Sequence, residues 1–255
     1  MSRVMRPVAV VDYPYSDGRP MAESEAQLRA MLYLVAALYA HFRDRDDVYV
    51  GADMFIYHEQ GSRKAVVAPD VFVALGVPKR AGNRRLSYKL WEEPKGPDFV
   101  LEVASRSTWA KDRERNRALY ARLGVQEYWL YDPTGEHIGS RLRAMRLDSG
   151  GYRELAPEAA ALEGRHLRSA VLGLDLRVDG AGELHVRNPR SAEEYLMPDE
   201  EHVARLAAEA RARREAEARQ AEAEARAAAE AKVAELQAQL REFRGGRTSS
   251  GDGQR

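Results

Sequence analysis

Apolar residues recur every three or four positions in two segments and form short unbroken runs in several others. Residues 24–42 show the helical spacing and predict an amphipathic helix, and residues 111–123 predict a second helix that ends at Gly124. Strands are predicted from the apolar runs around residues 48–50, 55–57, 64–77, 96–108 and 124–133. Short strands and turns are expected from residue 135 to residue 186. This order predicts an α/β layer whose sheet is covered on both sides.

The composition changes sharply after Pro198. From Asp199 to Arg244 the chain is rich in Ala, Glu, Arg, Gln and Leu and contains neither Gly nor Pro, which predicts one long helix with Asp199 as its N-cap. Its two heptad runs are out of phase, so a solvated helix and a dimerising coiled coil are both open. We therefore divide the chain into a globular domain (1–190), a charged helix (191–244) and a disordered tail (245–255).

Charge and composition exclude several classes of protein. The 255 residues carry a formal net charge of zero, so no overall field favours nucleic acid or a membrane surface. The absence of cysteine excludes disulfides and thiolate metal sites and fits a reducing compartment. No run is long and apolar enough to span a bilayer or act as a signal peptide. We expect a soluble cytoplasmic protein.

Two acidic residues stand inside predicted strands. Asp70 and Glu102 are each surrounded by apolar residues, where a carboxylate is costly unless something compensates its charge. Alternation places Asp70 on the face of Phe72 and Glu102 on the face of Ala104, so the two converge if their strands are neighbours. Together with the backbone carbonyl of Val103, they form a hard-oxygen set suited to Mg²⁺ or Mn²⁺. A metal ion held there could activate water against a phosphodiester.

Several long motifs appear in a fixed order between residues 24 and 187: APDVFVALGVPK (68–79), PDFVLEVASRSTWAKD (97–112) and LYARLGVQEYWLYDPTG (119–135). On these motifs the chain resembles the Uma2-like family of restriction-endonuclease-like proteins. The resemblance implies the PD-(D/E)xK nuclease fold, a mixed central sheet flanked by helices, followed here by the long C-terminal helix. It also implies that the metal ligands lie on adjacent strands.

The resemblance assigns the acids but not the expected lysine. Asp70 takes the position of the aspartate in the family's proline–aspartate motif, and Glu102 that of the second acid. The nuclease superfamily usually has lysine where this chain has Ala104. The family's D-x-x-x-K-x-x-x-Y pattern, beginning at Asp112, would place it at Asn116. Neither lysine is present, and a neighbouring arginine is not equivalent in reach or proton chemistry.

An acid on the first helix often completes such a site, and Glu25 is the best candidate. Glu25 could equally serve the helix dipole and a capping box. The basic segment 79–95 could line a phosphate-binding groove or form a solvated loop. Asp98, which follows Pro97, is expected to mark an exposed strand start.

These expectations combine into one hypothesis and one alternative. The first is a Mg²⁺- or Mn²⁺-dependent endonuclease that hydrolyses DNA through a water activated by the metal, with Asp70, Glu102 and Glu25 as catalytic residues. It would form a homodimer, or bind a partner protein, through the C-terminal helix. The alternative is a catalytically inactive nucleic-acid-binding or scaffold protein on the same fold, which the absence of both lysines favours.

Overall fold

A computed structural model describes residues 11–16, 24–79, 85–104, 109–157 and 166–197, and isolated residues between 209 and 226. Residues 109–113 are described as backbone only. The chain divides into two units, 1–197 and 198–255. Tyr195, near the end of the first unit, is hydrogen-bonded to residues earlier in that unit. The amide of Tyr195 donates to the carbonyl of Val186, and the Tyr33 hydroxyl donates to the carbonyl of Tyr195.

A six-stranded mixed sheet forms the centre of the first unit, in the order β1-β4-β6-β7-β8-β9. Its strands are β1 (Val48–Ala52), β4 (Val71–Leu75), β6 (Phe99–Val103), β7 (Glu127–Tyr131), β8 (Leu142–Asp148) and β9 (Gly151–Glu154). Within this sheet, β6 and β7 are the one parallel pair of neighbours. The chain between them forms helix α2 (Trp109–Arg122). The other neighbours are antiparallel, including β4 beside β6.

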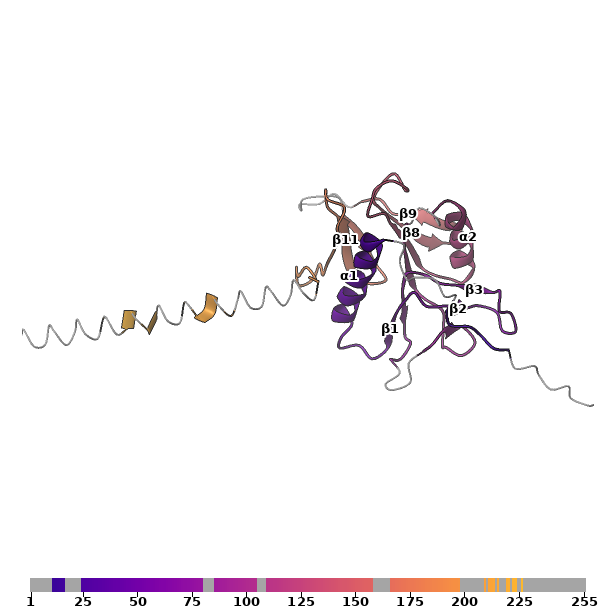
Figure 1. The fold of residues 1–255 in the computed structure, drawn as a ribbon, viewed down its shortest axis with the longest axis horizontal. Helices are drawn as coiled ribbons and strands as arrows, with labels where there is room; N and C mark the ends of the chain where they lie inside the picture. Colours follow the sequence, from indigo (N-terminus) through magenta and orange to yellow (C-terminus); the bar gives the residue numbers. More distant parts are fainter. Residues whose placement is uncertain are drawn as a thin grey trace, which may run out of the picture. The chain divides into compact units, whose positions relative to one another are not determined.

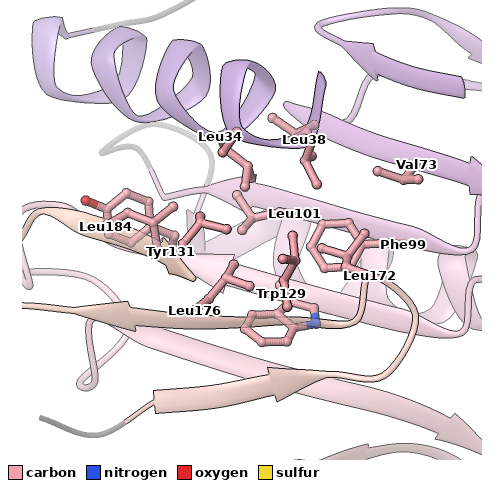
Figure 2. Packing of buried hydrophobic residues seen from close by; sticks show 14 of the residues in the cluster. Leu34, Leu38, Val73, Phe99, Leu101, Trp129, Tyr131, Leu172, Leu176 and Leu184 are labelled. Atoms are coloured by element: carbon pink, nitrogen blue, oxygen red, sulfur yellow. The ribbon is translucent and has the colours of Figure 1, made fainter. Parts of the chain in front are cut away.

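One face of this sheet is covered by helix α1 (Glu25–His41) and a three-stranded sheet of β10 (His166–Ser169), β11 (Leu174–Val178) and β12 (Leu184–Arg187). Figure 2 shows Leu34 and Leu38 of α1 facing Leu101 and Phe99 of β6. Trp129 of the central sheet lies beside Leu176 of β11 in the same cluster. This apolar layer is the larger core of the protein.

The opposite face is covered by α2 and a small sheet of β2 (Ile56–Tyr57), β3 (Val66–Val67) and β5 (Tyr88–Lys89). Figure 1 shows α1 and β11 on one side of the central strands and α2, β2 and β3 on the other. Phe72, Val100 and Tyr128 point into this second core, where they meet Tyr120 of α2. Asp70 and Glu102 belong to the same face by strand alternation.

The architecture confirms the predicted α/β layer with a mixed central sheet and a covering on each face. The two predicted helices correspond to α1 and α2 within two residues at each end. The expectation for Asp98 is wrong, since its side chain is only 2% exposed. It accepts hydrogen bonds from the amide of Leu75, the ammonium of Lys95 and the amide group of Gln126. These three donors compensate the burial of its charge.

The second unit contains the predicted helix and tail. The described residues between 209 and 226 are helical, and the rest of 199–244 and the tail 245–255 lie outside the described residues. The long helix and the coiled coil therefore both stay predictions. Within the described part of the chain, no helix is both long and apolar enough to cross a membrane.

Glu127 ties the central sheet to the sheet of β10–β12. Its carboxylate is fully buried on β7 and accepts from Arg146 (2.9 Å), the Ser169 hydroxyl (2.6 Å) and the amide of Ala170 (2.9 Å). Replacing Glu127 by alanine removes the acceptor of the buried Ser169 hydroxyl and the ion-pair partner of Arg146. We expect a loss of about 3 kcal/mol in the free energy of unfolding, measured by urea denaturation.

The matched control is Glu154→Ala, which breaks a largely exposed pair with Arg143. Exposed pairs contribute little, so we expect a loss below about 1 kcal/mol. Equal losses in the two variants would contradict the structural role given to Glu127.

Candidate active site

Asp70 and Glu102 face each other across two antiparallel strands. Asp70 immediately precedes β4, and Val71 pairs with Leu101 of β6, so the next pair in register is Asp70 with Glu102. Each acid binds the main chain of the other strand. The Asp70 amide donates to Oε2 of Glu102 (3.3 Å), and the Val103 amide donates to Oδ2 of Asp70 (2.6 Å). The two carboxylates are therefore held together at one end of the sheet, as the alternation pattern predicts.

Helix α2 supplies two further donors to Glu102. The Tyr120 hydroxyl donates to Oε1 at 2.7 Å, and Nδ2 of Asn116 lies 3.4 Å from the same oxygen. The two residues are four positions apart, so they occupy one face of the helix a turn from each other. Asn116, at the family's lysine position, thus faces the acidic pair.

Burial dominates the electrostatics of Asp70. Loss of hydration raises the pKa of its carboxyl to about 6, and the negative charge of Asp53 adds to the shift. The hydrogen bonds from Val103 and with Glu102 act in the opposite direction. Asp53 reaches this position because its amide donates to the carbonyl of Asp70, with its own backbone in the left-handed region (φ +43°).

The first helix contributes a glutamine where a glutamate is expected. Glu25 is exposed in the first turn of α1. Gln27 is buried, and its Nε2 donates to the carbonyl of Ala104 at 3.0 Å, just beyond β6. Ser24 caps the helix by accepting from the Gln27 amide. The spacing of Ser24 and Gln27 is that of a capping box, in which the glutamine returns to the cap, so the sequence gives no sign of this contact.

The described cations of the basic segment are engaged with nearby groups. Arg85 forms a buried ion pair with Glu93 and lies 4.3 Å from the centre of the Tyr49 ring. Lys89 pairs with Glu92 and Lys95 with Asp98, while Lys79 binds main-chain carbonyls after α1. Residues 80–84 lie outside the described residues. The contacts of the described part are those of a packed connection rather than of an open cationic groove.

Comparison with known proteins places this chain in a family. The family model Uma2, described as "Putative restriction endonuclease", matches residues 10–179. The chain belongs to the Uma2 family. A solved structure described as a "putative nuclease belonging to DUF820 from Anabaena variabilis" matches with a TM-score of 0.43 and 14% identity, over 62% of this chain and 81% of that chain. A search of curated proteins gave no significant match.

The lysine positions of this Uma2 protein differ in environment. Ala104 is buried, with 7% of its surface exposed, and belongs to the core between the sheet and α2. Asn116 is half-buried on the helix. Arg117 is exposed and its guanidinium donates to the carbonyl of Tyr152, away from the acids. The side chains of Lys111 and Arg113 lie outside the described residues.

The donor set fits a hard divalent cation that keeps most of its water. Among the residues that the structure describes, no group of three or more His, Cys, Asp or Glu side chains could hold a metal ion. Glu25 therefore does not join Asp70 and Glu102 as a third carboxylate. Two carboxylates are sufficient for Mg²⁺, which is commonly held by one or two of them with several waters. The raised pKa of Asp70 also marks a buried charge that a cation would neutralise.

Proposed function

We propose that this protein is a metal-dependent endonuclease that hydrolyses phosphodiester bonds in DNA, with Asp70 and Glu102 holding Mg²⁺ or Mn²⁺. The observation that carries the proposal is the reciprocal hydrogen bonding of the two carboxylates across β4 and β6. No ion pair joins Asp70 to a basic side chain of the described residues, whereas Lys95 pairs with Asp98 and Arg146 pairs with Glu127. Membership of the Uma2 family supports nuclease chemistry.

The protein's own groups position the reactive centre. The Val103 amide fixes Oδ2 of Asp70, which leaves Oδ1 for a ligand. Tyr120 and the Asp70 amide fix the two oxygens of Glu102. The carbonyl of Val103 stays the proposed third oxygen, whereas Glu25 is better explained by the dipole of α1. A divalent cation bound here would supply Lewis-acid activation of the phosphate and of the attacking water.

The same fold supports a second candidate function. A nucleic-acid-binding or scaffold protein without cleavage activity would need no lysine, and Ala104 and Asn116 stand at both of its expected positions. This candidate keeps the nucleic-acid partner and lacks metal-dependent cutting. In either case the helix predicted for residues 199–244 is proposed to pair two subunits or to bind a partner protein.

The test is incubation of supercoiled plasmid with the full chain in Mg²⁺, in Mn²⁺ and in EDTA. We expect nicking that requires the metal and is lost in Glu102→Gln. Glu154→Gln is the control, because it changes an exposed glutamate on β9 without touching the acidic pair. Binding of a fluorescent duplex is measured in parallel. Binding without nicking by the folded wild type would favour the second candidate and overturn the first.

A further inference from the structure

Tyr120 is a buried side chain whose one polar group points at the acidic pair. Only 1% of its surface is exposed, and its ring lies 5.2 Å from that of Tyr128, centre to centre. Its hydroxyl oxygen lies 2.7 Å from Oε1 of Glu102. A buried phenol needs a hydrogen-bond partner. The partner of Tyr120 is a carboxylate of the proposed active site rather than a main-chain group.

The state of the phenol limits what it can do. Burial raises the pKa of Tyr120 well above its ordinary value, and the charge of Glu102 raises it further. The hydroxyl therefore keeps its proton at neutral pH and acts as a donor. It cannot replace the missing lysine as a cation.

The hydrogen bonds around Glu102 define its orientation from two sides. Tyr120 holds Oε1 from α2, and the amide of Asp70 holds Oε2 from β4. Asn116 is a second donor to Oε1, at the longer distance of 3.4 Å. Without the hydroxyl, the carboxylate would lose the shorter of these two contacts from α2.

We propose that Tyr120 is a positioning residue, which sets the orientation of the Glu102 carboxylate for binding a divalent cation. This inference rests on the proposed function, since it concerns the same site. Hydrogen-bond partners of metal-binding carboxylates typically change metal affinity by about 10- to 100-fold when removed. Tyr120 affects metal affinity through Glu102, without contacting the cation or the substrate.

Tyr152 provides a matched control. It belongs to the same core cluster, is also buried, and donates its hydroxyl to the carbonyl of Val125 at 2.7 Å. Tyr152→Phe removes a hydroxyl from the same core without changing the surroundings of Glu102. A structural role alone would give the two variants similar behaviour.

The experiment is a titration of the full chain with Mn²⁺. Metal binding is measured by the rise in melting temperature and, in a separate series, by the rate of plasmid nicking. We expect Tyr120→Phe to raise the half-saturating Mn²⁺ concentration about 10- to 100-fold in both measurements. Tyr152→Phe should stay within about twofold of the wild type, because it leaves Glu102 unchanged. Asn116→Ala should also raise the half-saturating Mn²⁺ concentration, by a smaller factor. This variant provides the test if Tyr120→Phe does not fold.

The outcomes separate the two proposals. A wild type that shows neither Mn²⁺ stabilisation nor nicking overturns the proposed function, and the role of Tyr120 with it. A metal-dependent wild type with an unchanged midpoint in the Tyr120 variant overturns the positioning role alone. Equal shifts in Tyr120→Phe and Tyr152→Phe overturn it as well.

Discussion

Replacing Asp70 by asparagine is expected to lower metal-dependent DNA cleavage by about 10³-fold while leaving the protein at least as stable. Asparagine keeps the size of the side chain and an oxygen that can accept from the Val103 amide. It removes the charge that the proposed cation requires. Cleavage is measured as the initial rate of plasmid nicking in Mn²⁺, and stability as the free energy of unfolding in urea. Undiminished nicking, or an unfolded variant, would contradict the assignment.

The stability of the metal-free protein should depend on pH through the same group. The pKa of Asp70 is raised from 3.8 to about 6 in the folded state, so the folded protein holds this proton more tightly than the unfolded chain. Its contribution to stability is complete below about pH 4 and is lost as the pH rises through 6. The loss amounts to about 3 kcal/mol. Asp70→Asn lacks it, so in EDTA the variant should become increasingly more stable than the wild type between pH 4 and pH 7.

Asp98→Asn tests whether the gain in stability on removing a buried carboxylate charge is specific to Asp70. The carboxylate of Asp98 is more completely buried than that of Asp70, but it has the ammonium of Lys95 at 2.5 Å. Removing its charge leaves that cation without its partner, so we expect a loss of stability at pH 7. A gain in both variants would mean that burial alone, rather than the lack of a cation, determines the behaviour of Asp70.

The unbroken apolar runs predicted the central layer because the strands around Asp70 and Glu102 are buried on both faces. The alternation of side chains along a strand placed each acid on the correct face. It could not show that the β4 and β6 strands are neighbours, since register and strand order depend on contacts far apart in the chain. That step came from the resemblance to the Uma2 family.

The sequence could not separate the acids proposed to bind a cation from those that form ion pairs. Asp98 and Glu127 also border apolar strands, yet Lys95 compensates Asp98 from three residues away and Arg146 of β8 compensates Glu127. The Arg146 partner is set by tertiary packing and leaves no local pattern. The same reason explains why Gln27, which binds the end of β6, was not recognised from a motif that resembles an ordinary helix cap.

Introducing lysine at position 116 is expected to raise the rate of metal-dependent nicking by about 10²-fold or more. Asn116 is half-buried on α2 and its amide lies 3.4 Å from Oε1 of Glu102. A lysine can lay its aliphatic stem along the helix and bring its ammonium to the acidic pair. There it would stabilise the negative charge that develops on the phosphate in the transition state.

Two further variants show whether the position and the charge both matter. Asn116→Met adds a stem of similar length without a charge, so it should give no gain. Ala104→Lys places the cation at the other expected position, which is buried in the core beside α2, and the cost of burying it should unfold or strongly destabilise the protein. Equal nicking rates for Asn116→Lys, Asn116→Met and the wild type would show that the missing lysine does not limit the reaction. If Asn116→Lys nicks plasmid and the wild type does not, the natural protein is the nucleic-acid-binding or scaffold protein without cleavage activity.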